Sequence, residues 1–314
     1  MMSEELEEPG YVVVIGAAGV DSKGRANVPL TLGSSTPGQV RVSVGGTARN
    51  VADNLARLGV DVVLLTAVGD DDSGKQVLEN AAEVGIDIDY VIVSPDHRTS
   101  AYLALLNEKG DLVMSVDDMS VMTCLTPPVI NEQRDLIKEA DMVVVDANLS
   151  KETLATVVRI ASRYKVPICA DPASTLLAPK LKPLLPKLFM VTPNVPEAKV
   201  LCGCSIDDEA QAITAARQLV NAGVDIALIT LAEEGVVYAT ADASGHVPAV
   251  VTQFVDSTGA SDALTAAVVF GLLNDIPIDE AVRLGASAAA LTLSCADTVC
   301  VDLSLELLYD HLMI

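Results

Sequence analysis

The sequence contains no tryptophan and only 3 phenylalanines among its 314 residues, so large aromatic side chains cannot dominate its core. Half of the residues are nevertheless hydrophobic, and most of these are alanine, valine and leucine. Small aliphatic side chains of this kind are typical of parallel sheets covered by helices. The length allows a sizeable core, and we expect one domain that spans residues 1–314.

Positive charge is also scarce, because 20 lysines and arginines face 43 acidic residues and give a formal net charge of −23. Such a chain repels phosphate backbones and anionic lipid heads, so we expect neither nucleic acid nor membrane as a partner. Solubility is the simpler explanation of the acidity. The acidic start, MMSEELEEPG, and the lack of a membrane-length apolar run favour a cytoplasmic enzyme.

Several motifs of known chemistry are absent. The 6 cysteines form no CxxC pair and have no histidines at zinc-binding spacing. The lone CxC at Cys202 and Cys204 is a weak metal signal, and we interpret the thiols as reduced and structural. No GxxxxGK[ST] loop, GxGxxG after the first strand or GxSxG elbow occurs, which argues against P-loop enzymes, dinucleotide-dependent dehydrogenases and α/β-hydrolases.

Strand-like and helix-like segments alternate along most of the chain. YVVVIGAAG reads as a buried strand, and GGTARNVADNLARLG reads as a helix in which Val51, Leu55 and Leu58 share one face. Repeated strand–helix–strand units predict a doubly wound, mostly parallel sheet. Two segments, roughly 17–44 and 96–116, instead carry strand and turn signals, and we expect them to pair into a small β-sheet lid.

The stretch DSTGASD, residues 256–262, joins an expected strand, VTQFV, to an expected helix. Free N–H groups of Gly259, Ala260 and Ser261 at the helix N-terminus would attract an anion. Asp262 in the first turn could remove a proton from a substrate hydroxyl beside a transferring phosphoryl group. The alternative, that this acid merely stabilises the helix, is equally good on this segment alone.

Three further places carry polar groups after expected strands. Asn194 and Glu197 in VTPNVPEA either cap a helix or hold Mg²⁺ through water. Asp21, Gly45, Gly46 and Asn50 could grip vicinal hydroxyls, although the two glycines could simply form a tight turn. Thr230 and Gly235 in ITLAEEGVVY could form a nucleotide-side loop or an ordinary β-turn.

Taken together and in order, these motifs resemble the ribokinase-like (PfkB-type) carbohydrate and nucleoside kinases over residues 11–310. The resemblance implies an α/β fold with a β-lid that often makes a dimer contact. It implies ATP and Mg²⁺ as cofactors, with a monovalent cation such as K⁺ near the anion-hole loop. It implies Asp262 as catalytic base, an anion hole at residues 259–261 and water-mediated Mg²⁺ at Asn194 and Glu197. The nucleotide-binding residues it implies are Asn194, Thr230, Ala232, Gly235 and Gly259.

A narrower likeness is to the pseudouridine kinases of this family, carried by VDSKGRA, MSVDDMSVMTCLTPPVI, VVDANLS and ADPASTLLAPKLKPLL. It implies transfer of phosphate to the 5′-hydroxyl of pseudouridine. The ribose would be bound by Asp21, Gly45, Gly46 and Asn50, and the base would lie near Lys23, Thr99 and Asp118.

Two residues depart from the family pattern: Ser261 stands where GAGD has its second glycine, and Ala232 replaces a usual glycine. If position 261 needed a positive φ angle, serine would cost about 1–3 kcal/mol there. Two alternatives therefore stay open. One is a kinase of another small sugar or nucleoside, such as ribose, fructose or adenosine, and the other is a weakly active or non-catalytic ligand-binding homologue.

Overall fold

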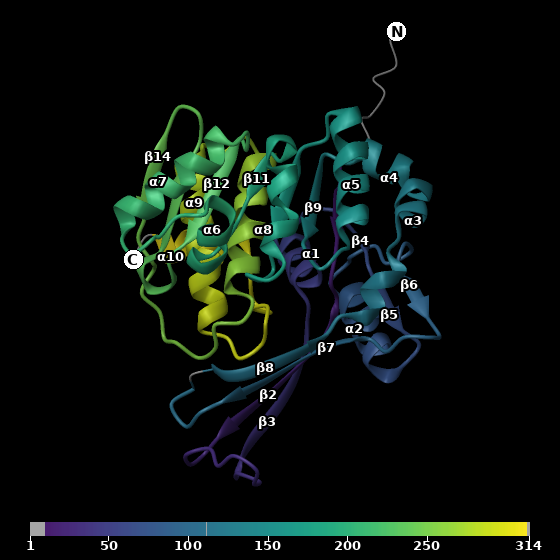
Figure 1. Ribbon diagram of the computed structural model, residues 1–314, viewed down its shortest axis with the longest axis vertical. Coiled ribbons are helices and arrows are strands. Elements are labelled where there is room, and N and C mark those ends of the chain that lie inside the picture. Colours follow the sequence, from purple (N-terminus) through teal and green to yellow (C-terminus); the bar gives the residue numbers. More distant parts are fainter. Residues whose placement is uncertain (1–9, 111, 313–314) are drawn as a thin grey trace.

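The computed structural model describes residues 10–110 and 112–312, and in this part of the chain a large sheet forms the centre of the molecule (Figure 1). Its strand order is β14-β13-β12-β11-β10-β9-β1-β4. The strands from β4 to β12 are parallel, while β13 and β14 form an antiparallel meander at one edge. Their bounds are β1 (Val12–Ile15), β4 (Val62–Leu65), β9 (Met142–Asp146), β10 (Ile168–Asp171), β11 (Met190–Val191), β12 (Ile226–Thr230), β13 (Val236–Ala239) and β14 (Ser244–Val247).

Helices cover both faces of this sheet, and each face has its own apolar core. One layer holds α3 (Pro127–Glu132), α4 (Arg134–Glu139), α5 (Lys151–Tyr164), α6 (Val195–Cys202) and α7 (Glu209–Asn221). The other holds α1 (Thr47–Arg57), α8 (Ala260–Leu273), α9 (Ile278–Leu293) and α10 (Leu305–Leu312). Short 3₁₀ turns lie at Ser120–Cys124, Ala178–Lys180, Lys182–Lys187 and Ala232–Glu234. The predicted doubly wound α/β architecture is confirmed.

A second, smaller sheet stands apart from this body, at the bottom of Figure 1. Its order is β3-β2-β7-β8, with β2 and β7 parallel and the outer pairs antiparallel. The strands are β2 (Gly19–Ala26), β3 (Gly38–Gly45), β7 (Ser100–Leu106) and β8 (Leu112–Asp118). They lie within or close to the two segments that break the strand–helix alternation. The sequence thus predicts the small sheet. It also predicts a hairpin turn at residues 108–111, which lies partly outside the described residues.

The two faces of the small sheet differ sharply in polarity. Cross-strand register aligns Asp21 with Ser43, Tyr102 and Asp117 on one face. On the opposite face, Ser22 and Gly24 are each aligned with apolar residues of the neighbouring strands. The apolar side chains of that second face are exposed and comprise Val40, Val42, Leu103, Leu105, Met114 and Val116. One face therefore carries polar groups, whereas the other is an uncovered apolar surface.

Three expectations about secondary structure are wrong. VTQFV is irregular, with Val251 and Phe254 exposed, because its β-branched residues have no strand to pair with there. VDVVLLTAVG, which its sequence predicts to be one strand, is two strands, since β4 ends before Thr66 and β5 (Ala67–Gly69) pairs with β6 (Ile92–Ser94) in a separate two-stranded sheet. The final long stretch, which its sequence predicts to be helical, is not continuously so, because α9 and α10 are separated by residues 294–304. That connection reaches the site described next.

Candidate active site

Polar side chains gather at the carboxyl ends of the parallel strands, where open α/β sheets bind their ligands. Asp146 ends β9, Asp171 ends β10 and Thr230 ends β12. Burial raises the pKa of Asp171, and the nearby carboxylates of Asp262, Glu197 and Asp146 raise it further. A concave region of about 670 Å³ lies at the opposite, amino end of the strands and is lined by Tyr11 and other residues that the sequence does not link to chemistry.

Helix α8 presents its N-terminus to this group of side chains. Gly259 is the N-cap, with φ of 84°, and no side chain caps the helix. The Ala260 N–H makes a long hydrogen bond to Ser257 O at 3.4 Å, and the helix N-terminus otherwise offers its N–H groups to an anion. Ser261 is exposed and has an ordinary helical φ, so the strain considered for serine at this position does not arise. Asp262 lies in the first turn and is buried, with 7% of its surface exposed.

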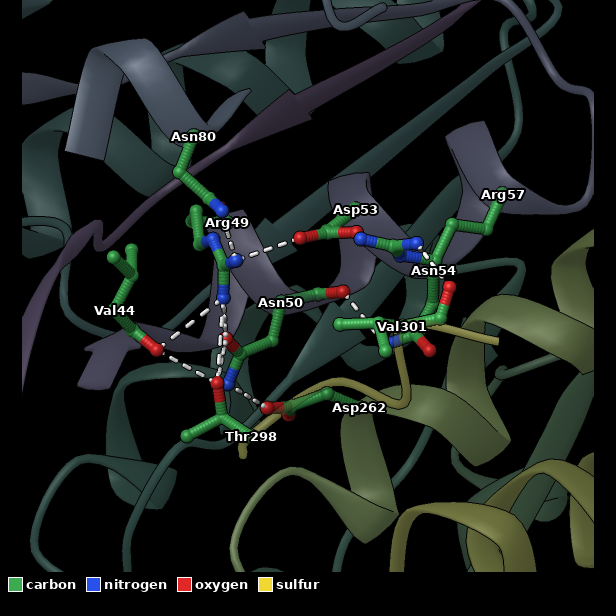
Figure 2. A network of polar contacts seen from close by, with 10 residues as sticks. All are labelled: Val44, Arg49, Asn50, Asp53, Asn54, Arg57, Asn80, Asp262, Thr298 and Val301. Atoms are coloured by element: carbon green, nitrogen blue, oxygen red, sulfur yellow. Dashed lines mark hydrogen bonds and ion pairs between the residues drawn. The ribbon is translucent and has the colours of Figure 1, made fainter. Parts of the chain in front are cut away.

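Among the described residues, Asn50 holds the carboxylate of Asp262 through a hydrogen bond that its Nδ2 donates at 2.7 Å (Figure 2). Burial raises the pKa of Asp262 to about 7, and Asp146 and Asp21 add to the rise, while the Asn50 hydrogen bond lowers it. A carboxyl group with a pKa near neutrality can exchange its proton at physiological pH. A raised pKa fits a proton acceptor, and that role of Asp262 stays a prediction.

Asn50 is oriented by Arg49, its neighbour on α1. Arg49 donates to Asn50 Oδ1 at 2.8 Å and to Asp53 Oδ2 at 2.6 Å. Because arginine can only donate, the amide oxygen of Asn50 must face Arg49, and its NH₂ group faces Asp262. Thr298, from the connection between α9 and α10, approaches the same amide oxygen at 3.2 Å. Figure 2 shows this chain of contacts from Arg49 through Asn50 to Asp262.

Sequence reasoning missed the role of Arg49. Arg49 and Asp53 lie on the polar stripe of the predicted helix, opposite the apolar face, where a solvated ion pair would be ordinary. Both are buried, with 3% and 1% of their surface exposed. Asp53 also pairs with Arg57 at 2.6 Å. The polar stripe is buried because α1 packs between the sheet and the segments around Asn80 and Thr298. The spacing of residues along α1 does not reveal this packing, because the contacting segments are distant in sequence.

Asp21 approaches the same region from β2 of the small sheet. It is 7% exposed, and burial raises its pKa to about 6 even though Lys23 and Arg49 act to lower it. A methyl group at Gly45 would lie 2.4 Å from Asp21 Oδ1, and Gly46 has φ of 96°. Gly45 is therefore required because a side chain there would collide with the Asp21 carboxylate, and Gly46 is required by its positive φ angle.

Asp146 is a second residue that sequence reasoning missed. Its carboxylate is buried and accepts N–H bonds from Ala17 at 2.7 Å, Ala48 at 3.2 Å and Asn148 at 2.9 Å. It thereby joins the end of β9 to the turn after β1 and to the first turn of α1. The stretch VVVDANLS contains it, but the sequence gives no sign that Ala17 and Ala48 bind it from 129 and 98 residues away.

Asn194 and Glu197 form a capping box at the start of α6. Asn194 Oδ1 accepts the Glu197 N–H at 3.0 Å, and Glu197 Oε2 accepts the Asn194 N–H at 2.9 Å. Asn194 is exposed, Glu197 is buried, and burial raises the pKa of Glu197. The capping role is thus observed, and it leaves the second oxygen of Glu197 outside the capping contacts.

The predicted nucleotide-side loop lies beside this cap, because the Thr230 N–H donates to Pro193 O at 3.1 Å. Ala232 has φ of 53°, in the left-handed region that favours glycine. This positive φ angle explains why glycine is usual at this position in the family. Alanine in the same conformation costs about 1 kcal/mol of stability. Gly235 has φ of 100°, and a methyl group on it would lie 2.2 Å from Val247 O.

The remaining predicted residues have other partners. The Thr99 hydroxyl donates to Asp71 Oδ1 at 2.6 Å and accepts from the Gly69 N–H at 2.9 Å. Asp118 is exposed at the end of β8 and accepts the Ser120 N–H at 3.0 Å. The structure does not join either side chain to the group around Asp262, and their contact with a substrate base stays a prediction.

Lys23 lies on the polar face of β2, but its ammonium group points to the loop before α8. It lies 2.8 Å from both carboxylate oxygens of Asp256. Within residues 10–110 and 112–312, no group of three or more histidine, cysteine, aspartate or glutamate side chains is arranged to bind a metal ion. A Mg²⁺ that keeps most of its waters needs no such group, so Asn194 and Glu197 fit water-mediated binding.

Comparison with known proteins agrees with this geometry. Residues 10–302 match the model of the pfkB family carbohydrate kinases. The chain is 31% identical to a pseudouridine kinase of Escherichia coli over 96% of both proteins. It is 29% identical to a guanosine-inosine kinase of Exiguobacterium acetylicum, over 95% of this chain and 99% of that one. An Arabidopsis thaliana ribokinase solved with ribose and ATP has a TM-score of 0.84 at 19% identity, covers 98% and 100% of the two chains and shows the shared fold.

These matches define a phosphotransferase that acts on a hydroxyl group. The chain belongs to the pfkB family of carbohydrate kinases, and the expected ribokinase-like fold is confirmed. Among the described residues, no helix is both long enough and apolar enough to cross a membrane.

Proposed function

We propose that this protein is an ATP-dependent kinase that phosphorylates the 5′-hydroxyl of pseudouridine to give pseudouridine 5′-phosphate. The observation that carries the kinase chemistry is Asp262, a buried carboxyl group with a pKa of about 7 in the first turn of α8. The pseudouridine specificity is supported by the 31% identity to a pseudouridine kinase along nearly the whole chain.

In this proposal, Asp262 accepts the proton of the substrate hydroxyl as the γ-phosphoryl group of ATP is transferred in line. The N–H groups of Gly259, Ala260 and Ser261 stabilise the charge that develops on the phosphoryl oxygens. Asn50 keeps Asp262 in place, since Arg49 fixes the direction of its amide. The products are ADP and the phosphate ester, and the proton first passes to Asp262.

The two substrates approach from different elements. Asp21, Gly45, Gly46 and Asn50 would bind the ribose hydroxyls, with Lys23, Thr99 and Asp118 on the side of the base. Thr230, Ala232, Gly235, Gly259 and Asn194 would line the nucleotide site. Asn194 and Glu197 would hold Mg²⁺ through water, and the ion when bound would supply positive charge that neutralises the phosphate groups. The small sheet would act as a lid that excludes water from the reaction.

One observation favours a second candidate. The likeness to a guanosine-inosine kinase has almost the same coverage as that to the pseudouridine kinase, so another nucleoside or a sugar is the main alternative acceptor. A weakly active or non-catalytic homologue is supported only by the strained alanine at position 232, because Ser261 fits its helix without strain.

An acceptor panel tests the proposed function. We expect ADP release with ATP and Mg²⁺ to be strong with pseudouridine and at least about 10-fold weaker with uridine, adenosine, guanosine, ribose and fructose, because a differing glycosidic link or base changes the polar contacts. Turnover on another acceptor would keep the mechanism and reject the specificity. Binding without ADP release across the panel would reject the kinase assignment and favour the ligand-binding homologue.

We also propose that two copies associate through the apolar face of the small sheet. Val40, Val42, Leu103 and Val116 are 77%, 56%, 52% and 66% exposed on this face. A contiguous apolar surface of this kind is unusual on a monomer and marks an interface. A second copy with the same face gives a self-complementary contact.

We expect wild-type protein to sediment as a dimer at micromolar concentration and a Val42→Lys, Val116→Lys variant to sediment as a monomer, because two ammonium groups would be buried without partners. Val251→Lys is the matched control, since Val251 is 96% exposed outside the small sheet. Analytical ultracentrifugation distinguishes the cases. A monomeric wild type would contradict this interface, as would a double variant that stays dimeric.

A further inference from the structure

Lys23 makes three contacts with the loop that precedes α8, and each joins residues more than 230 positions apart in sequence. Its Nζ lies 2.8 Å from Asp256 Oδ1, 2.8 Å from Asp256 Oδ2 and 2.5 Å from Thr258 Oγ1. These contacts match the three hydrogens of an ammonium group. The pair is largely shielded from water, because the two side chains are 11% and 21% exposed.

Asp256 in turn shapes the loop, because its Oδ1 also accepts the Thr258 N–H at 2.8 Å. Thr258 is followed by Gly259, the N-cap of α8, whose N–H groups form the proposed anion hole. Lys23 therefore ties a strand of the small sheet to the backbone immediately before that anion hole. Displacement of Lys23 would leave the half-buried carboxylate of Asp256 without its positive partner, two residues before Thr258.

The likeness to the family implies a monovalent cation near this loop, and the residues present do not fit one. Asp256 is the sole acidic residue in positions 249–261. Both of its oxygens already contact the ammonium group of Lys23. A metal ion would have to displace the ammonium group of Lys23. That group is covalently attached to the chain, so it loses no translational entropy when it contacts Asp256.

We propose that Lys23 is a positioning residue that serves as a built-in cation: its ammonium group holds the Asp256–Thr258 loop, so phosphoryl transfer needs no added monovalent ion. The same contact couples the position of the small sheet to the geometry of the anion hole. This proposal rests on the proposed kinase function but not on the identity of the acceptor.

Chemical rescue tests the proposal with any acceptor that the wild type phosphorylates. With tetramethylammonium as the sole added monovalent cation, we expect the wild-type kcat to lie within about 2-fold of its value in K⁺. Lys23→Ala should lower kcat by about 10- to 100-fold, more than it raises KM, and NH₄⁺ or methylammonium should restore activity saturably. Lys23→Met should lose similar activity without rescue, because its side chain fills the space.

Arg41→Ala is the matched control. Arg41 also links the small sheet to the body, through Asp297 at 2.8 Å, but this pair is 48% and 53% exposed and its contact does not involve residues 256–258. We expect its kcat to change less than about 2-fold. A wild type that requires K⁺ would overturn the proposal, as would Lys23→Ala activity that small ammonium ions do not restore.

Hydrogen exchange supplies a readout that needs no turnover. The amides of residues 258–260 should exchange at least about 10-fold faster in Lys23→Ala than in wild type or Arg41→Ala, and added NH₄⁺ should reverse the change. Unchanged exchange would overturn the positioning role. If no acceptor were phosphorylated by any form, the proposed function would fail, while the exchange result would still decide whether Lys23 holds the loop.

Discussion

Replacing Asp262 by Asn should reduce kcat by about 10²- to 10⁴-fold while the fold survives, because the variant loses the proton acceptor but keeps the shape. The new amide oxygen can still accept the hydrogen bond that Asn50 Nδ2 donates at 2.7 Å. Steady-state ADP release measures the loss. Wild-type turnover in Asp262→Asn would show that this residue is not the base.

Asp279→Asn is the control for the purely structural interpretation. Asp279 also lies in the first turn of a helix, α9, where its negative charge interacts favourably with the helix dipole. If an acid at a helix start were all that mattered, the two variants would behave alike. We expect Asp279→Asn to keep wild-type turnover and to lose less than about 1 kcal/mol of stability.

The pH dependence of wild type and Asp262→Asn completes this test. Since the pKa of Asp262 is raised to about 7, the free enzyme holds the base form only above that pH. Wild-type kcat/KM should therefore fall about 10-fold per pH unit well below pH 7, whereas the residual activity of Asp262→Asn should not follow that titration. A wild-type profile that stays flat down to pH 5 would contradict the assignment.

The same shift predicts an unusual stability difference. Between the unfolded pKa near 4 and the folded pKa of about 7, the folded protein binds the proton more tightly, so this group's contribution to the free energy of unfolding falls as pH rises. The asparagine of Asp262→Asn does not ionise, so this variant does not lose that part of the free energy of unfolding as pH rises. It should be more stable than wild type at pH 8, by at most about 4 kcal/mol, and the gain should shrink towards pH 5. Thermal unfolding without ligands measures both values.

The sequence predicts the fold well because its signals are local and repeated. Strand and helix periods recur through the body, and the position of Asp262 follows from a turn next to an apolar helix. The small sheet is predicted for the same reason, since its segments lack helical period. The strand expected at VTQFV fails because β-branched residues form a strand only where another strand lies beside them.

The parts of the site that sequence reasoning misses depend on distant contacts. Arg49 reaches Thr298, and Asp146 binds N–H groups of Ala17 and Ala48, across more than 90 positions in each case. Neither residue stands in a motif whose spacing carries that information. Lys23 is a similar case, because the sequence places it near a substrate base and the structure shows its ammonium group on Asp256.

Gly259→Ala should have the second large effect, because the new methyl group would meet the backbone of the α9–α10 connection. An ideal Cβ at Gly259 lies 1.8 Å from Thr298 O, and φ at this residue is 84°. Either the start of α8 or the segment around Thr298 must move, and both lie beside Asp262 and Asn50. A displacement near 1 Å at a reacting group costs about 10²-fold in rate.

Gly85→Ala separates the steric conflict from the cost of the backbone conformation. Gly85 has φ of 87°, almost the same as Gly259, but a Cβ there would meet nothing within 4 Å. Gly85→Ala should lose about 1 kcal/mol of stability and keep full turnover, because it carries only the left-handed penalty. Gly259→Ala should lose more stability and at least about 100-fold in kcat. Equal stability losses with unchanged turnover would mean that the start of α8 can shift without disturbing the anion hole, and the proposed geometry of phosphoryl transfer would then be wrong.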